Sequence, residues 1–244
     1  MADLTLLDLV ANRTVDASIA ATLAAVGHER HTFLVAAIPR WAGKSTASEA
    51  ILGCCPPGTA RHDLTGDVEQ LEQLSRDNLG GYAVVAEFSP RGMGSYMWGE
   101  AAQAALRLTD AGYSVASSIH ADSMENAIAL VANEIGAGDS LTAKFRYVVY
   151  IERLGEGTPG GENNFWRRAA TVHEIEDVTD GYAKARLLHR WDPESDIFER
   201  VEEPAALATP HSTIEDWSAA ITRAVGDGRT SSDVLDAIIA GEAG

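Results

Sequence analysis

Cysteine and basic residues are scarce in this chain of 244 residues. Its two cysteines, Cys54 and Cys55, are adjacent, so they do not make a disulfide framework, and this usage fits a reducing compartment. Lysine and arginine total 19 against 36 aspartate and glutamate residues, which gives a formal net charge of −17. Bulk nucleic-acid binding requires clustered basic side chains, so this composition argues against a nucleic-acid partner.

Long apolar runs are missing as well. No stretch approaches the roughly 20 apolar residues that a membrane-spanning helix requires. The N-terminus has no basic region ahead of an apolar run, so we expect no secretory signal and a cytoplasmic location. Apolar residues make up 45% of the chain and charged residues 23%, which is typical of globular domains and unlike disordered chains.

The middle of the chain alternates between apparent buried strands and helices. Apolar runs of strand length occupy residues 32–37 and 82–86, and residues 113–119 are a third strand candidate. Helical patterns follow them at residues 44–53, 96–109 and 124–135, the last with Ser123 as its expected cap. Because such strands are buried on both faces, the pattern predicts an α/β fold with a mostly parallel sheet covered by helices on both sides.

The two ends of the chain have a different pattern of expected helices and strands. In residues 4–26 the apolar side chains recur at the spacing of a helix, and residues 14–16 interrupt this pattern. After Lys144, strand-like segments follow one another directly and indicate antiparallel pairing, at residues 145–154, 165–178, 183–191 and 197–202. Two helices are expected in the tail, at residues 213–225 and, capped by Ser232, at residues 233–240. We therefore divide the chain into a helical lead-in (1–30), a core with C-terminal strands (31–204) and a helical tail (205–244).

A candidate phosphate-binding loop follows the first apolar run. Gly43-Lys44-Ser45-Thr46 stands between a strand and a helix, the layout of a Walker A motif, in which N–H groups at a helix N-terminus hold phosphate. In this layout Lys44 reaches the β- and γ-phosphates, and the Ser45 hydroxyl ligates Mg²⁺. Ile38 replaces the first glycine of the motif, and a β-branched residue resists the positive φ that glycine accepts. The alternative interpretation is an ordinary strand–turn–helix with an exposed lysine.

Two polar residues end the next two apolar runs. Glu87 follows the run at 82–86, and His120 follows the run at 113–119. The carboxyl ends of parallel strands are where α/β folds bind ligands, so both residues are candidates for the same site as the loop. Glu87 is placed to hold Mg²⁺ or to polarise an attacking water. The alternative for each is a solvated or satisfied residue at a strand end.

Four parts of the chain have sequence patterns similar to those of one protein family. They are the loop at 38–46, the run 83–87 that ends like an atypical Walker B motif, the His-Ala-Asp-Ser segment within 112–123, and the strands around 153–154, 167–168, 172–175 and 196–198. Together they resemble the type II/IV secretion ATPases, in particular the CpaF-like ATPases of Flp/Tad pilus assembly. The resemblance covers residues 4–200.

The resemblance implies a RecA-like P-loop NTPase core in a hexameric motor that uses ATP and Mg²⁺. It places the nucleotide on Pro39, Arg40, Trp41, Ala42, Gly43, Lys44, Ser45 and Thr46, and the metal on Ser45 and Glu87. It gives catalytic roles to Glu87, to His120 as a sensor of the γ-phosphate, and to Asp67 or Glu69 of an acidic box. It implies as partners further copies of this chain and proteins of a secretion or pilus machinery, with the membrane reached only through those proteins.

Several departures from the family pattern support a second hypothesis. Besides Ile38 in the loop, Gly66 replaces the first glutamate of the acidic box, and the interval from that box to Glu87 is short. Only about 30 residues precede the loop, so we do not expect the separate N-terminal domain that supplies arginines in this family. The residues of this chain that could take the place of those arginines are Arg91, Arg146, Arg167 and Arg168.

These departures favour a non-hydrolysing relative that acts as a structural or regulatory partner of an active motor. A third hypothesis is a P-loop enzyme of another class, such as a small-molecule kinase. That class requires basic residues around a substrate lid, and the sequence shows no arginine cluster of this kind.

Overall fold

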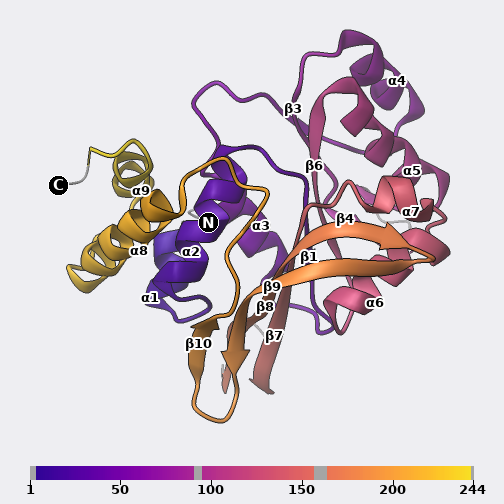
Figure 1. Ribbon diagram of the computed structural model, residues 1–244. Coiled ribbons are helices and arrows are strands. Elements are labelled where there is room, and N and C mark those ends of the chain that lie inside the picture. Colours follow the sequence, from indigo (N-terminus) through magenta and orange to yellow (C-terminus); the bar gives the residue numbers. More distant parts are fainter. Residues whose placement is uncertain (1–3, 91–94, 157–163, 243–244) are drawn as a thin grey trace.

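A single mixed β-sheet separates two layers of helices (Figure 1). The computed structural model describes residues 4–90, 95–156 and 164–242, so Arg91 lies outside the described residues. The α/β class and the mostly parallel sheet agree with the alternation of apolar runs and helical patterns. Both termini of the described chain lie on the same side of the sheet, where α8 and α9 meet α1 and α2.

The sheet is parallel in its middle and antiparallel at one side. Its strands follow the order β10-β9-β8-β7-β1-β6-β3-β2, and β4 pairs with β6 and β5. The strands with parallel partners are β1 (Phe33–Ala36), β2 (Arg61–Asp63), β3 (Gly81–Val84), β4 (Glu87–Phe88), β5 (Tyr96–Met97), β6 (Tyr113–Ile119) and β7 (Tyr147–Glu156). The antiparallel strands that continue from β7 are β8 (Asn164–Thr179), β9 (Tyr182–Asp192) and β10 (Ile197–Arg200).

Strand β1 connects the two layers through its alternating side chains. Phe33 and Val35 belong to one apolar cluster, and Leu34 and Ala36 belong to the other. Because successive residues of a strand point to opposite faces, a strand between two helical layers must be apolar at every position. This is the physical reason that the run at 32–37 has no polar alternation.

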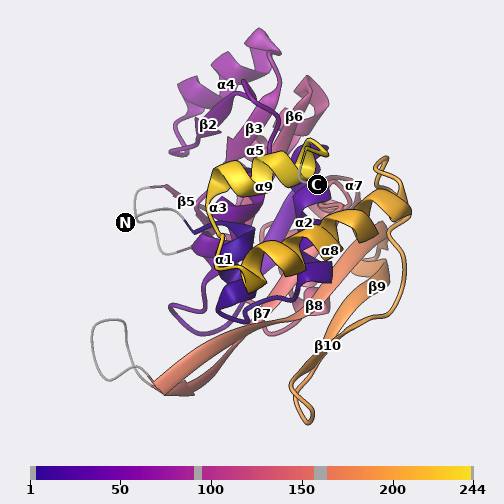
Figure 2. The ribbon, with the colours of Figure 1, turned by 90° about the vertical axis from the view of Figure 1, so that its left-hand side faces the viewer.

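Each face of the sheet has its own set of helices. One face is covered by α1 (Leu6–Ala11), α2 (Ala17–His28), α3 (Lys44–Leu52), α8 (His211–Gly226) and α9 (Ser232–Ile239). The other is covered by α4 (Val68–Asp77), α5 (Glu100–Arg107), α6 (Met124–Ala129) and α7 (Gly138–Thr142). Figure 2 looks onto the first layer and shows α8 lying across the helices of the lead-in.

The structure differs from the predicted elements in three places. The helix expected over 96–109 begins only at Glu100, because Gly99 precedes it at a φ of 56° and residues 96–97 form β5. Strand β2 and helix α4 were not predicted, since β2 is a short polar strand and α4 buries only Leu71 and Leu74. Ser232 does not cap the last helix but begins it, whereas Ser123 caps α6 as expected by accepting from the Asn126 N–H.

Two carboxylates attach the helical tail to the rest of the molecule. Glu174, which is 2% exposed, accepts hydrogen bonds from the backbone N–H groups of Ala205 and Ala206 at 3.0 and 2.9 Å. Glu29 accepts from the N–H groups of Ala208 and Thr209 at 2.8 and 2.6 Å. The tail then packs α8 on α2, in the apolar cluster that contains Phe33 and Val35 of β1. The division at residues 30 and 204 stays a prediction.

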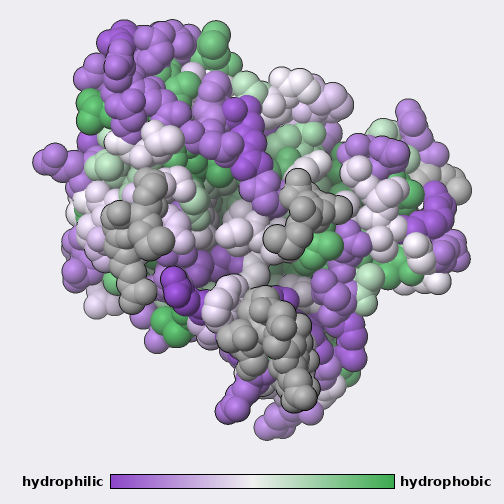
Figure 3. Space-filling view, turned by 180° about the vertical axis from the view of Figure 1, so that it is seen from behind, coloured by the Kyte–Doolittle hydropathy of each residue, from purple (hydrophilic) through white to green (hydrophobic). Residues whose placement is uncertain are grey.

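The face of the molecule seen from behind is mostly hydrophilic (Figure 3). From behind, apolar residues lie in separate patches among hydrophilic ones (Figure 3). None of the helices in the described parts of the chain combines the length and apolar character required to cross a bilayer.

One histidine is enclosed in the core. His189 on β9 is 1% exposed, and its Nε2 lies 2.9 Å from the hydroxyl of Thr22 on α2. Burial, together with the positive charge of Arg200, lowers the pKa of His189 to about 3 from its ordinary value of 6.5. The folded protein therefore holds this side chain neutral at pH values where an unfolded chain would protonate it.

This difference in proton binding predicts a dependence of stability on pH. Between pH 6.5 and about 3 the unfolded chain binds a proton at His189 that the folded chain does not, so stability falls as the pH falls, by up to about 1.4 kcal/mol per pH unit. Urea unfolding from pH 7.5 to 5 measures this slope. The His189→Gln variant should have a shallower slope over the same range, and equal slopes for the two proteins would contradict the assignment.

Candidate functional site

The predicted phosphate loop connects β1 to α3 across the carboxyl edge of the sheet. Gly43 is the N-terminal cap residue of α3, with a φ of 94°, and no side chain caps the helix. The N–H groups of the first helical turn therefore have no side-chain acceptor. An uncapped helix N-terminus carries partial positive charge and attracts anions.

Positive backbone φ in the loop falls on Trp41 and Gly43. Trp41 has a φ of 60°, whereas Ile38 is not among the residues with positive φ. The conformational difficulty expected at Ile38 thus occurs three residues later, at a bulky tryptophan. Ile38 and Trp41 are both 50% exposed, so neither side chain is enclosed by packing.

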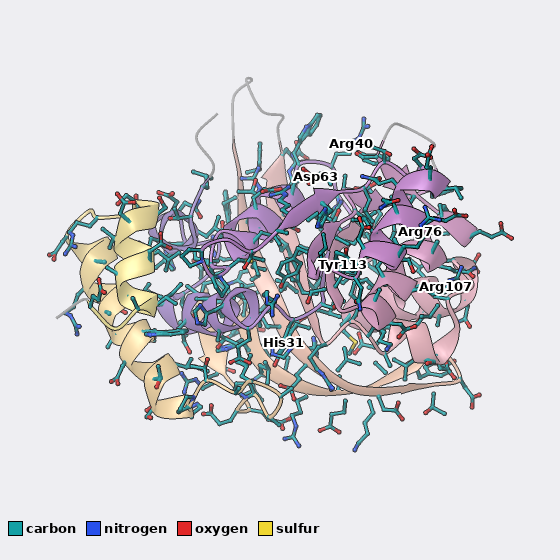
Figure 4. The ribbon with its side chains drawn as sticks, turned by 90° about the horizontal axis from the view of Figure 1, so that it is seen from above. His31, Arg40, Asp63, Arg76, Arg107 and Tyr113 are labelled. Carbon is teal, nitrogen blue, oxygen red and sulfur yellow. The ribbon has the colours of Figure 1, made fainter. Side chains whose placement is uncertain are left out.

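The remaining loop residues divide between the core and the surface. Ala42 is buried in the apolar cluster beneath α3, and Pro39 is half-buried. Arg40 and Ser45 are exposed, and Thr46 is half-buried on the first turn of the helix. Figure 4 shows Arg40 and Asp63 near one edge of the sheet, whereas His31, which precedes β1, lies at the opposite edge.

Three polar side chains predicted from separate parts of the chain meet below this loop. Lys44 Nζ lies 3.3 Å from Glu87 Oε2, and His120 Nε2 lies 3.3 Å from Glu87 Oε1. Lys44 Nζ and His120 Nε2 are 3.4 Å apart, which closes the triangle. We refer to Lys44, Glu87 and His120 as the polar trio. They come from α3, from β4 and from the end of β6, so the trio forms where these elements converge.

The second nitrogen of His120 fixes the orientation of its ring. Nδ1 lies 2.8 Å from the carbonyl oxygen of Ile38. A carbonyl oxygen only accepts, so Nδ1 carries a proton and donates it to the loop backbone. Nε2 lies between the Lys44 ammonium, which only donates, and the Glu87 carboxylate, which only accepts. It therefore accepts from Lys44 when the ring is neutral and donates to Glu87 when the ring is charged. His120 thereby connects the backbone of the loop to the side chains of the trio.

Lys44 and Glu87 depend on one another electrostatically. Each is 8% exposed. Burial lowers the pKa of Lys44, and the nearby charge of Glu87 opposes that shift. A buried charge without a partner is costly, so each of the two stabilises the ionised form of the other.

The structure does not bring Asp67 and Glu69 to the trio. Both are exposed at the start of α4, where Asp67 caps the helix and accepts from the Glu69 N–H at 3.1 Å. In the contacts of the described residues neither side chain touches Lys44, Glu87 or His120. Their position gives them a structural role at the helix start.

Another carboxylate, not predicted from the sequence, lies beside Ser45. A cavity of about 250 Å³ is bordered by Ser45, Glu49, Arg61 and Asp63, among other residues. Arg61 donates to Glu49 at 2.8 Å and to Asp63 at 2.9 Å, which holds both carboxylates at the cavity. Asp63 ends β2, so the signal that would have found it is a carboxylate that closes a short polar strand.

A second cavity, of about 430 Å³, lies beside His120. Its lining includes Ile38 and Arg40 from the loop, Trp98, and His120 itself. The trio therefore has open space near both Ser45 and His120. No group of three or more His, Cys, Asp or Glu side chains that could hold a metal ion occurs in the described part of the chain.

The arginines named from the sequence have different surroundings in the structure. Arg167 reaches the loop, where its Nε donates to the carbonyl of Trp41 at 2.9 Å. Arg153, from the facing strand, donates to the carbonyl of Arg40 at 3.0 Å. Both arginines are far from the loop in sequence, and the β7–β8 pairing places them beside it.

The other two candidates are used elsewhere. Arg146 donates to the carbonyl of Ile175 at 2.6 Å, beside the start of β7, which is the opposite edge of the sheet. Arg168 is 5% exposed and ion-paired with Asp196 at 2.7 Å. Arg91 lies outside the described residues.

Comparison with known proteins gives no assignment of this site. No protein-family model matches the chain, and no match was found among curated proteins.

Replacing Glu87 with glutamine leaves the buried Lys44 ammonium without its anion. We expect Glu87→Gln to reduce the free energy of unfolding by about 3 kcal/mol, because removing one partner leaves an uncompensated buried charge. Urea denaturation at pH 7 measures the change.

The matched control is Glu72→Gln on α4. Glu72 is 62% exposed and pairs with Arg76 at 3.6 Å on the surface, so its loss should cost less than about 0.5 kcal/mol. Equal effects of the two substitutions would show that the trio is not coupled.

Proposed function

We propose that this protein binds and hydrolyses Mg-ATP as a subunit of a type II/IV secretion or type IV/Flp pilus motor. The observation that carries the nucleotide part is the nearly buried Lys44–Glu87 pair with His120, placed below an uncapped helix N-terminus. A lysine enclosed at that point, with a carboxylate as its partner, has the chemistry of a group that binds phosphate oxygens in place of the carboxylate.

The strand order supports the finer assignment of the fold as a RecA-like P-loop core. β1, the strand of the loop, lies between β7 and β6, and β6 separates it from β3. Glu87 follows β3 and His120 follows β6, so both side chains reach the carboxyl end of β1. Ligands of open α/β sheets bind at such a position.

The residues present fit a nucleoside triphosphate. The backbone from Pro39 to Gly43 and the first turn of α3 would surround the phosphates, and Lys44 would contact their terminal oxygens. Ser45 is exposed and borders the cavity that holds Asp63. Mg²⁺ takes few protein ligands beside phosphate oxygens and water, so Ser45 and Glu87, directly or through water, fit its requirements. When bound, the ion supplies neutralisation of phosphate charge.

The chain's own residues then have separate tasks. Lys44 exchanges the Glu87 carboxylate for phosphate oxygens, which frees Glu87 to orient a water molecule. His120 responds to the same exchange, because its Nε2 contacts both partners while its Nδ1 contacts the loop. Hydrolysis of this kind depends on positioning and charge stabilisation rather than on covalent chemistry by the protein.

The motor part of the proposal rests on the resemblance of the His-Ala-Asp-Ser segment and of the C-terminal strands. It comprises a ring of identical copies, six in this family, partners in a secretion or pilus machinery, and a cytoplasmic location at the inner face of the membrane. Analytical ultracentrifugation with and without nucleotide tests the ring.

A non-hydrolysing relative is the second candidate function, and the backbone of Trp41 favours it. A bulky residue at a φ of 60°, with an exposed side chain, stands where small residues let the loop approach phosphate. Such a protein would keep the fold, bind nucleotide, and act as a structural or regulatory partner of an active motor.

Binding and hydrolysis of ATP are separated by two substitutions. Lys44→Ala should abolish both nucleotide binding and phosphate release, since it removes the cation of the trio. Glu87→Gln should retain binding and reduce phosphate release by roughly 100-fold or more, the order of a lost general base. Calorimetric titration and a phosphate-release assay on the same samples measure the two effects.

The matched control is Lys144→Ala, an exposed lysine that pairs with Asp110 at 2.8 Å, and it should behave as the unmodified protein. Binding without release in the unmodified protein would establish the non-hydrolysing relative. If the unmodified protein binds no nucleotide, the proposed ATPase is wrong, and the non-hydrolysing relative would act as a structural partner without nucleotide.

A further inference from the structure

Two arginines of the β7–β8 hairpin lie against the outer side of the candidate phosphate loop. Arg153 and Arg167 are directly opposite each other across the hairpin. Arg153 Nη1 donates to the carbonyl of Arg40 at 3.0 Å, and Arg167 Nε donates to the carbonyl of Trp41 at 2.9 Å. The two arginines thus donate to two consecutive carbonyls of the loop backbone. Arg153 lies 113 residues after its partner in sequence, and Arg167 lies 126 residues after its own.

The carbonyl held by Arg167 belongs to the residue with the least favourable backbone conformation in the loop. Trp41 has a φ of 60°, which L-residues with bulky side chains adopt rarely. Its side chain is half exposed, so packing does not enforce this conformation. The charged hydrogen bond from Arg167 is the contact that opposes relaxation of the Trp41 peptide.

Both arginines are themselves held in place by one aromatic ring. The guanidinium carbon of Arg153 lies 4.3 Å from the centre of the Phe165 ring, and that of Arg167 lies 4.9 Å from it. The stem of Arg167 also runs directly over Gly43, where an added Cβ would lie 2.8 Å from Arg167 Cδ. Phe165 and Gly43 together fix the direction in which Arg167 approaches the loop.

The two guanidinium groups concentrate positive charge beside the loop. Burial and the neighbouring Arg153 lower the pKa of Arg167. No carboxylate among the described residues lies within ion-pair distance of Arg167, so its charge is not neutralised there. An anion in the loop would reduce the repulsion between these two cations.

We propose that Arg153 and Arg167 are positioning residues that brace the phosphate loop from outside and hold Trp41 at a positive φ that glycine would adopt freely. Through the carbonyls of Arg40 and Trp41 the brace holds the N–H groups of the loop in the orientation that binds phosphate. The consequence for phosphate affinity rests on the proposed function, whereas the brace is a property of the free protein.

Hydrogen exchange of the free protein tests the brace without any ligand. In Arg167→Ala we expect the backbone amides of residues 38–46 to exchange roughly tenfold faster, with β6 unchanged, because a charged hydrogen bond to the loop is lost. Arg153→Ala should have a smaller effect in the same segment. Arg190→Ala, which removes an exposed arginine paired with Glu199 on the same sheet, should have none. Unchanged exchange of the loop in Arg167→Ala would overturn the proposal.

Binding of tripolyphosphate tests the consequence for affinity. Arg167→Ala should raise its Kd roughly tenfold. Adding Trp41→Gly to Arg167→Ala should restore most of this loss, since glycine adopts a φ of 60° without a brace. No restoration would show that Arg167 acts through its charge alone and would overturn the positioning role.

The exchange and binding experiments together distinguish an error in the proposed role of the two arginines from an error in the proposed function. If the unmodified protein binds neither tripolyphosphate nor ATP, the proposed function is wrong, and the exchange experiment alone decides the brace. If it binds both but loop exchange and affinity are insensitive to Arg167, the nucleotide site stands and the brace is wrong.

Discussion

Lys44 and Glu87 form a nearly buried ion pair, and the arrangement of the candidate site depends on it. Lys44 begins α3 at a helix end that is itself electropositive, so the ammonium requires an anion to remain charged in a buried position. Glu87 supplies that anion in the free protein. A phosphate group would satisfy the same requirement and would release Glu87, so binding becomes an exchange of one anion for another.

The members of the polar trio could be predicted because Glu87 and His120 follow strand-like segments and Lys44 stands in a recognisable loop at a helix start. The runs at 32–37 and 82–86 are apolar at nearly every position, which identifies strands buried on both faces. The segment at 113–119 includes three serines and is a further strand candidate, and parallel strands place their carboxyl ends at one edge. Glu87 and His120 follow from that rule, whereas Lys44 follows from the Gly-Lys-Ser-Thr segment that begins α3. Asp63 was not predicted, because β2 is three residues long, polar and without an apolar run to mark it.

The loop illustrates what a local sequence pattern cannot provide. Comparison with a glycine-rich motif drew attention to Ile38, yet the positive φ lies at Trp41 and Gly43. The groups that hold Trp41 come from a hairpin 126 residues later, and only the register of β7 against β8 places Arg167 beside Arg153. Asp67 and Glu69, although close to a family pattern in sequence, lie at the start of α4, where Asp67 caps the helix.

The exchange of anions at Lys44 is the central claim, and the imidazole of His120 reports it directly. Its Nε2 contacts Lys44 and Glu87, whereas its Nδ1 contacts the Ile38 carbonyl. ¹⁵N spectra of histidine-labelled protein, assigned with His120→Asn, should show the Nε2 resonance of His120 moving on saturation with Mg-ATP while Nδ1 stays protonated. An Nε2 resonance that does not move at saturating nucleotide would contradict the account.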